Sequence, residues 1–248
     1  MIRLFHDLES LSRAAADLFA DLADQAISLN GRFSVALSGG QTPYRLYEIL
    51  AGEPYKDKIH WGFVHIFWAD ERCVPPDDPR SNFRMARETL LDHVPLPLEN
   101  IHPIQGDLAP AEAAAQYESV LRTYFGDHPP VLDLILLGMG SNAHVASLFP
   151  HSPVLNEKKR WVAEISVPGQ DMYRVTLTPP LINLAGQVIF LVSGAEKSLA
   201  LQRVLEGTYQ PSEYPAQLIR SRGAYPVWLV DKEAGHKLTL PDETESAD

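Results

Sequence analysis

The sequence predicts a three-layer α/β/α fold built on a mostly parallel, open β-sheet. Short runs of continuously apolar residues, such as 134–137, are typical of strands that helices cover on both faces. Between these runs lie longer segments whose apolar residues recur every three or four positions, as in amphipathic helices. Such alternation indicates parallel strands joined by crossover helices.

The composition favours one large domain. The chain has 248 residues, of which 45% are hydrophobic and 21% are charged, so it can bury a substantial core. Strand and helix signals continue along its length, and we expect a single α/β domain over residues 1–240. The acidic segment 241–248 has no large apolar residue, and we expect a disordered tail there.

The first half of the chain begins with a helix over residues 8–29, ended by Asn30-Gly31. An apolar strand follows at 33–37 and ends in the turn Ser38-Gly39-Gly40. Thr42 is then expected as the N-cap of the next helix, with Pro43 at its first position. The result is a strand, a glycine turn and a helix.

The same order returns further along. A strand at 64–69 runs into Asp70-Glu71-Arg72 and a proline-rich loop, after which Ser81 is expected to cap a helix. We expect a short strand at 101–104, a helix from Pro110 to about Tyr124, and a strand at 132–137.

The last third continues the pattern. The glycines after strand 132–137 are expected to start a short helix whose free N–H groups would favour an anion. Further strands are expected at 175–177, 188–192 and 227–230, with a helix at 196–205 between the last two.

Charge and cysteine content exclude several classes of function. A formal net charge of −11 disfavours binding to nucleic acid or to anionic membranes, so only local groups could attract a small anionic substrate. Cys73 is the only cysteine, which rules out an intrachain disulfide and suits a reducing compartment. We see neither a secretory leader pattern nor an apolar run of membrane-spanning length, and we expect a cytoplasmic protein.

Polar clusters follow four of the expected strands. Ligands of open α/β sheets bind outside the carboxyl ends of the strands, so the fold would gather these clusters at one edge. Each alone could arise by chance; their shared placement is the stronger evidence. The clusters are Ser38-Gly39-Gly40, Asp70-Glu71-Arg72, 138–144 and 193–197.

The first cluster resembles a phosphate cradle. Gly39 and Gly40 expose backbone N–H groups at a helix start, and the hydroxyls of Ser38 and Thr42 could donate to phosphate oxygens. The Walker spacing with its lysine is absent, as is the GxGxxG dinucleotide pattern. A tight turn before a capped helix is an equally good interpretation of this loop alone.

Three basic residues are candidates for holding an anion. Arg72 could bind a phosphate, a carboxylate or a developing oxyanion, with Asp70 beside it; a solvated ion pair is the simpler alternative. Arg174 and Lys197 could anchor a dianionic phosphate if the sheet brings them to the first loop. Lys158, Lys159 and Arg160 are better explained as a solvated basic run.

His144 is the candidate base. It follows Gly138 and Gly140 at the end of a buried strand, and a neutral imidazole can take a proton from water near pH 7. The alternative is a histidine that only packs against a turn. The sequence shows no metal-ligand pattern such as HExxH and no GxSxG nucleophile elbow, so we expect neither a metal site nor serine-hydrolase chemistry.

These motifs together resemble the 6-phosphogluconolactonase family, part of a wider group that includes the glucosamine-6-phosphate deaminases. The resemblance covers most of the chain, and several motifs in one order make it more specific than any single motif. They are Ser38-Gly39-Gly40 with Thr42-Pro43, Asp70-Glu71-Arg72 with Ser81-Asn82-Phe83-Arg84-Met85, Gly138-Met139-Gly140 leading to His144 and 146–150, then 174–178 and 194–197.

The resemblance implies a Rossmann-like sugar-phosphate isomerase/lactonase fold and hydrolysis of 6-phospho-D-glucono-1,5-lactone in the oxidative pentose phosphate pathway, with no cofactor. It implies catalysis by His144, Arg72 and Asp70, with His144 activating water and Arg72 stabilising the charge on oxygen. The implied substrate contacts are Ser38, Gly39, Gly40, Thr42, Gly140, Asn142, Arg174 and Lys197.

One departure from the family lies beside the expected base. The family more often has Asp-Gly before this histidine, whereas this chain has Asn142-Ala143, which supplies no charge and is less suited to positive φ. The alternatives to a lactonase are an aminosugar-phosphate deaminase or isomerase and a non-catalytic sugar-phosphate-binding homologue. For this protein we expect a small sugar-phosphate lactone as the binding partner, and a monomer or weak homo-oligomer as the assembly.

Overall fold

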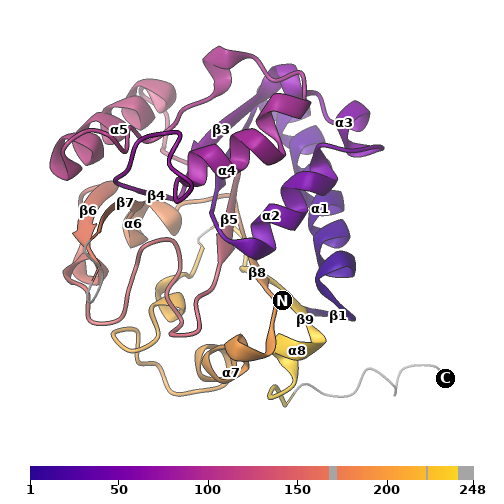
Figure 1. Ribbon diagram of the computed structural model, residues 1–248, viewed down its shortest axis with the longest axis vertical. Coiled ribbons are helices and arrows are strands. Elements are labelled where there is room, and N and C mark those ends of the chain that lie inside the picture. Colours follow the sequence, from indigo (N-terminus) through magenta and orange to yellow (C-terminus); the bar gives the residue numbers. More distant parts are fainter. Residues whose placement is uncertain (168–171, 222, 240–248) are drawn as a thin grey trace.

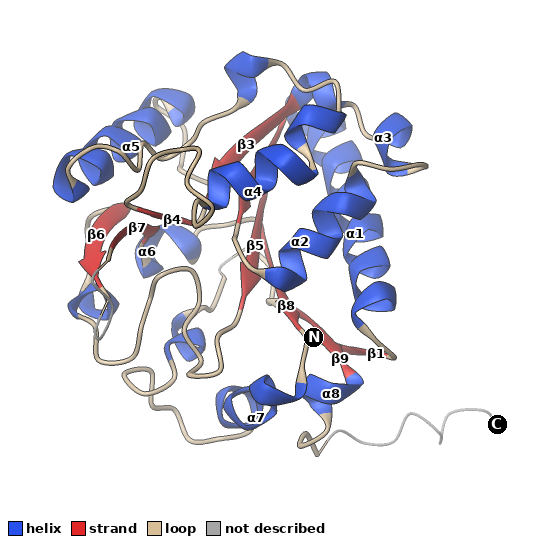
Figure 2. Cartoon of the chain, in the orientation of Figure 1, coloured by secondary structure: helices blue, strands red, loops and turns tan. Residues whose placement is uncertain are grey.

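A six-stranded parallel sheet forms the centre of the computed structural model, which describes residues 1–167, 172–221 and 223–239 (Figure 1). Its strand order is β1-β9-β8-β5-β2-β3, and every neighbouring pair is parallel. The strands are β1 (Ile2–Phe5), β2 (Phe33–Leu37), β3 (Val64–Trp68), β5 (Leu134–Gly138), β8 (Gln187–Val192) and β9 (Val227–Asp231). Helices flank the sheet, which confirms the predicted three-layer α/β architecture (Figure 2).

The longer helices alternate with the strands as the sequence indicates. They are α1 (Leu8–Asn30), α2 (Gln41–Leu50), α4 (Asn82–Thr89), α5 (Pro110–Phe125) and α7 (Ser198–Leu205). Three short helices, α3 (Tyr55–Lys58), α6 (Pro179–Ile182) and α8 (Lys232–Gly235), complete the α-helical elements of the described chain. No described helix is long and apolar enough to cross a membrane.

A second, antiparallel sheet was not predicted. It has the order β4-β7-β6, formed by β4 (Asp70–Arg72), β7 (Tyr173–Leu177) and β6 (Val162–Ser166). The expected strand at 175–177 therefore exists but belongs to this smaller sheet. Its length and apolar content do not distinguish it from a strand of the main sheet, so the sequence could not assign it. The sequence also gave no signal for the edge strand β1, whose two central residues are exposed.

Several helix starts differ from the prediction. Helix α2 begins at Gln41, with Gly40 as its N-cap and no side-chain cap, so Thr42 and Pro43 are the second and third residues of the helix. Gly40 has φ 110°, a conformation open to glycine, and the chain turns there rather than at Thr42. By contrast, Ser81 caps α4 as expected, accepting from the N–H of Arg84 at 3.1 Å.

The short helix expected after Gly140 is absent. Residues 141–150 form turns with a single bridge between Val145 and Leu148, and Ala143 and Ala146 have φ of 62° and 48°, which a right-handed helix cannot contain. The expected strand at 101–104 is reduced to one bridge between Ile66 and Ile101, because Pro103 cannot donate to a ladder. The first turn of the expected helix 196–205 is a 3₁₀ turn, Ala195–Lys197, ahead of α7.

Two buried tyrosines hold the carboxyl ends of the central strands. The hydroxyl of Tyr47 donates to the carbonyl of Ser38 at 2.8 Å, and that of Tyr117 donates to the carbonyl of Trp68 at 3.0 Å. Both side chains are completely buried, so these bonds satisfy backbone groups where the ladders end. They fix the positions from which the loops after β2 and β3 start.

Candidate active site

The polar clusters meet in one cavity of about 460 Å³ beyond the carboxyl ends of β2, β5 and β8. The small sheet closes its other side through Asp70, Arg72 and Arg174. Ten of the eleven residues predicted from the sequence line it: Ser38, Gly39, Gly40, Thr42, Asp70, Arg72, Gly140, His144, Arg174 and Lys197. Asn142 lies outside the cavity wall, against His144.

A larger hollow of about 790 Å³ lies at the opposite edge of the sheet. Its walls include Arg32 and Asp133, which come immediately before β2 and β5, together with Tyr124 at the end of α5. It contains none of the predicted site residues. Size alone therefore does not identify the site in this molecule. The site is identified by the polar and charged side chains that meet at the carboxyl edge of the sheet.

The glycine loop opens the N-terminus of α2 toward the cavity. Gly40 is the N-cap of α2, so the first backbone N–H groups of that helix have no capping side chain and can bind an anion. The hydroxyl of Ser38 donates to the carbonyl of Leu136 at 2.8 Å, so its proton is already used within the sheet. Backbone N–H groups and Thr42 are the better donors for a phosphate in this loop.

His144 is fixed by a bond to the neighbouring amide. Its Nδ1 lies 2.6 Å from Oδ1 of Asn142, and its backbone N–H donates to the same oxygen at 3.3 Å. An amide oxygen only accepts, so Nδ1 carries the proton and Nε2 keeps its lone pair. This arrangement leaves the imidazole as a neutral base.

Burial weakens the basicity of His144. Desolvation lowers its pKa from 6.5 to about 4, which the charge of Asp70 opposes and those of Arg174, Lys197 and Arg72 reinforce. The ring stacks on Phe149 with centroids 4.3 Å apart and 19° between planes. His144 is therefore neutral at pH 7 and held from two sides.

Gly140 allows this imidazole to lie directly on the backbone. A Cβ at position 140 would come within 2.1 Å of Nδ1 of His144, closer than any side chain permits. The loop closes through N–H of Gly140 donating to the carbonyl of His144 and N–H of Ala143 donating to the carbonyl of Gly140, both at 2.9 Å. Ala143 accordingly adopts the left-handed conformation that a glycine would take without strain.

Two arginines face one another across the small sheet. Arg72 of β4 is the register partner of Arg174 of β7, and the ion pair between Arg174 Nη1 and Asp70 Oδ2 spans 3.7 Å. Burial lowers the pKa of Arg174, Asp70 opposes that change, and Arg72 adds to it. Like charges placed opposite one another are unfavourable in a sheet unless an anion offsets them. The pair therefore favours an anionic ligand.

Asp70 is braced by hydrogen bonds. It is 4% exposed, and its Oδ2 accepts from the hydroxyl of Ser147 at 2.6 Å. Nδ2 of Asn82 donates to the backbone carbonyl of Asp70 at 2.9 Å and lies 3.4 Å from its Oδ1. Asn82 also lines the cavity, although its sequence context indicated only a helix cap.

Glu71 does not form the solvated ion pair that was the alternative interpretation of this cluster. The side chain is buried, and its carboxylate accepts from the backbone N–H of Arg72, Asn82 and Phe83 at 2.7, 2.8 and 2.7 Å. It also accepts from the hydroxyl of Ser81 at 3.0 Å. Glu71 therefore ties β4 to the start of α4, and this role left no signal in the sequence.

Lys197 reaches the cavity from the opposite wall. Its Nζ lies 3.7 Å from Oε1 of Glu196, a residue that the sequence did not single out and that also lines the cavity. The loop before it is fixed by Asp231, which accepts from the N–H of Gly194 at 3.1 Å and from the hydroxyl of Ser193. The Asp231 carboxylate thus holds the β8–α7 loop in place.

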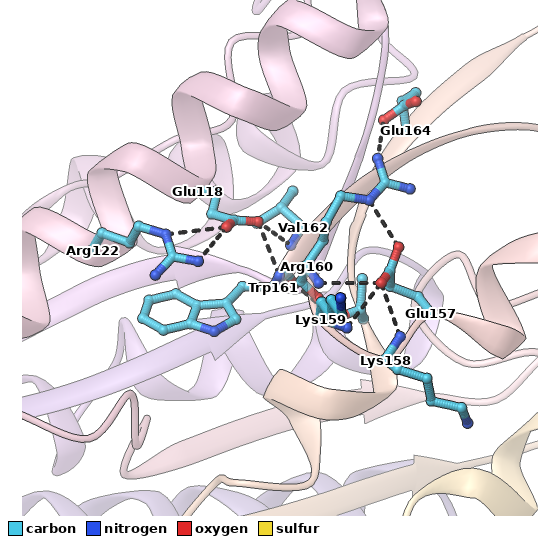
Figure 3. Close-up of polar contacts among 10 residues, drawn as sticks. Glu118, Arg122, Glu157, Lys158, Lys159, Arg160, Trp161, Val162 and Glu164 are labelled. Carbon is cyan, nitrogen blue, oxygen red and sulfur yellow. Dashed lines mark hydrogen bonds and ion pairs between the residues drawn. The ribbon is translucent and has the colours of Figure 1, made fainter.

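The basic run 158–160 lies beside Glu157 and Glu164, as Figure 3 shows. The backbone N–H groups of Lys158, Lys159 and Arg160 all donate to Glu157, and the Arg160 guanidinium bridges Glu157 and Glu164 at 2.8 and 3.1 Å. No residue of this run lines the cavity. Elsewhere in the described ranges, no three His, Cys, Asp or Glu side chains come close enough to hold a metal ion.

The sequence is similar to a known protein family and to named members of it. The family model for glucosamine-6-phosphate isomerases/6-phosphogluconolactonase matches residues 6–228. The 6-phosphogluconolactonase of Nostoc sp. is 42% identical over 243 residues, covering 96% of this chain and 98% of that protein. The Synechocystis sp. 6-phosphogluconolactonase is 45% identical over 218 residues, with 86% and 88% covered.

Solved structures of this family have the same fold as this chain. The 6-phosphogluconolactonase of Trypanosoma cruzi superposes with a TM-score of 0.85 at 30% identity, covering 96% of this chain and 97% of that one. A monomeric glucosamine-6-phosphate deaminase superposes with a TM-score of 0.81 at 20% identity, covering 95% and 98%, which shows a shared fold.

Proposed function

The chain belongs to the glucosamine-6-phosphate isomerase/6-phosphogluconolactonase family, and we propose that it hydrolyses 6-phospho-D-glucono-1,5-lactone with His144 as general base. The product is 6-phospho-D-gluconate, and the reaction belongs to the oxidative pentose phosphate pathway. The hydrogen bond from Nδ1 of His144 to Asn142 is the observation that carries this proposal, because it leaves Nε2 free to accept a proton.

The chemistry follows from this lone pair. Nε2 takes a proton from water as the water oxygen attacks the lactone carbonyl carbon, and the carbonyl oxygen becomes an oxyanion. Arg72 stabilises that charge, which develops only in the transition state. The ester bond to the ring oxygen then breaks, and the imidazolium returns its proton to that oxygen. One water is consumed, and the open-chain acid is formed.

The remaining cations hold the other end of the substrate. The N-terminus of α2, Lys197 and Arg174 bind the phosphate, so binding energy far from the ester positions the carbonyl before His144. Asp70 keeps Arg174 in place through their ion pair and supports the imidazolium that forms during the reaction.

Freshly prepared lactone tests the proposal. We expect the protein to consume it faster than the spontaneous rate, and His144→Gln to lose about 10²- to 10⁴-fold in kcat while still binding 6-phosphogluconate. Full activity in His144→Gln would refute the assigned base. Binding of 6-phosphogluconate without any acceleration would identify a non-catalytic homologue, and release of ammonia from glucosamine-6-phosphate would identify a deaminase.

The proposal extends to location and assembly. We propose a cytoplasmic enzyme that acts as a monomer or weak homo-oligomer; a single cysteine, Cys73, suits a reducing compartment. Cell fractionation and light scattering at micromolar concentration test these two statements.

A further inference from the structure

Asn82 occupies a position between the phosphate loop and the catalytic strand. It is the first residue of α4, is 2% exposed and lines the cavity. Its backbone N–H donates to Oε1 of the buried Glu71 at 2.8 Å, which fixes the backbone at the start of the helix. The side chain therefore projects from a fixed point.

The orientation of its amide is determined by a backbone carbonyl. Nδ2 lies 2.9 Å from the carbonyl oxygen of Asp70, which can only accept, so the NH₂ end of the amide faces β4. The oxygen end then faces the other way. No residue in the described part of the chain donates a hydrogen bond to Oδ1.

That oxygen end lies against Gly39. A Cβ built on Gly39 would be 1.8 Å from Oδ1 and 2.5 Å from Cγ of Asn82, distances that no side chain permits. Gly39 has no unusual positive φ, so its missing side chain serves the amide rather than the backbone. Asn82 thus contacts the glycine loop with one end and Asp70 with the other.

These two contacts join segments that belong to different sheets. The glycine loop follows β2 of the parallel sheet, whereas Asp70 and Arg72 lie on β4 of the antiparallel sheet. The proposed reaction needs a phosphate on the first segment and a carbonyl beside the second at the same time. A misplacement of about 1 Å between them costs roughly 10²-fold in rate.

We propose that Asn82 is a positioning residue that sets the distance between the phosphate-binding loop and the Asp70–Arg72 strand through the two ends of its amide. This inference rests on the proposed lactonase function. It assigns to Asn82 no contact with the reacting atoms. Gly39 is its counterpart, because the amide fits only against a residue without a side chain.

A double-mutant cycle between positions 39 and 82 tests the contact directly. Gly39→Ala in the natural background is expected to lower kcat/KM for the lactone by about 100-fold, since the new methyl pushes against the amide. In the Asn82→Ala background the amide is gone, and Gly39→Ala is expected to cost less than about threefold more. Equal losses in both backgrounds would overturn the proposal.

A second pair of variants separates positioning from packing. Asn82→Leu keeps the branched shape of the side chain and loses the bond to the Asp70 carbonyl; we expect kcat to fall at least about tenfold with a smaller change in KM. Asn100 is a matched control, 7% exposed with Nδ2 donating to the carbonyl of Gly62 at 3.2 Å, and it is remote from the cavity. Asn100→Ala should lower the melting temperature and leave kcat and KM unchanged. Full kcat in Asn82→Leu would show that the residue only fills space.

The unsubstituted protein separates this proposal from the proposed function. If it does not accelerate lactone hydrolysis, the function fails, and the same cycle is then measured as the Kd for 6-phosphogluconate by calorimetry. Coupling between positions 39 and 82 in that Kd supports the positioning role, and additive losses refute it.

Discussion

Nδ1 of His144 and Oδ1 of Asn142 lie 2.6 Å apart, so a neutral amide fixes the imidazole of the proposed base. The other ring nitrogen, Nε2, is left to accept a proton. The resemblance to the lactonases leads us to expect a carboxylate at this position. An amide fixes the tautomer equally well but does not stabilise a protonated ring. The consequence is a base that stays neutral well into the acid range.

Asn142→Asp should change the pH dependence of the reaction. The pKa of His144 is about 4, so kcat/KM should fall only as the pH drops toward that value. A carboxylate at 142 favours the imidazolium and should raise this pKa by roughly 1 to 3 pH units, moving the acid limb of the profile to higher pH. Initial rates between pH 4 and 8 measure it. An unmoved or lower limb would contradict the assignment.

Phe149→Leu should impair catalysis more than its effect on stability explains. The Phe149 ring stacks on His144 and also lies 5.3 Å below the Arg174 guanidinium. We expect kcat to drop about two- to tenfold and the free energy of unfolding to fall by about 1 to 2 kcal/mol. Phe125→Leu is the control and should change only stability, because Phe125 is similarly buried but packs on Tyr124 and Trp161 rather than on a site residue.

Lys197→Met should raise KM about 10- to 100-fold with little change in kcat, because a charge-assisted bond to phosphate is worth about 1.5 to 3 kcal/mol. Lys158→Met provides the comparison, since Lys158 lies beside Glu157 and away from the cavity. Steady-state kinetics on both variants decide the matter. A similar rise in KM for Lys158→Met would mean that the phosphate reaches the basic run instead.

Glu71→Gln should destabilise the fold. One carboxylate oxygen becomes an NH₂ group and can no longer accept from the two donors that face it, a loss of about 2 kcal/mol in the free energy of unfolding. Urea unfolding measures it. Glu88→Gln, on the exposed face of the helix α4 that Glu71 holds, should cost less than about 1 kcal/mol. Equal costs would show that Glu71 is not the anchor of α4.

His65 and His102 should make the protein sensitive to acid. Nδ1 of His65 lies 3.3 Å from Nε2 of His102 beneath Tyr124, and burial lowers both pKa values, that of His102 to about 4. The unfolded chain then binds protons that the folded chain refuses, so stability is full above about pH 6.5 and is lost as the pH falls toward 4. His102→Gln should flatten the fall of melting temperature over that range. The exposed His6→Gln should leave it unchanged.

Local pattern was enough for the main elements. Short runs rich in apolar residues predicted β2, β3, β5, β8 and β9, because strands that helices cover on both faces are mostly apolar. Where backbone conformation overrides composition the prediction was wrong, as at Gly40, which caps α2 in place of Thr42, and at Ala143, whose positive φ prevents a helix after Gly140.

The sequence by itself determined the main parallel sheet, its flanking helices and the polar clusters that follow its strands, because strand length, apolar period and glycine position are local properties. Only the tertiary structure decided how those residues face one another. It set Arg72 opposite Arg174, placed Phe149 under His144 and brought the Asn82 amide against Gly39. The first and the last of these contacts join segments far apart in the chain, so they depend on how the strands pair. The stacking of Phe149 on His144 depends on the turns that the intervening loop adopts.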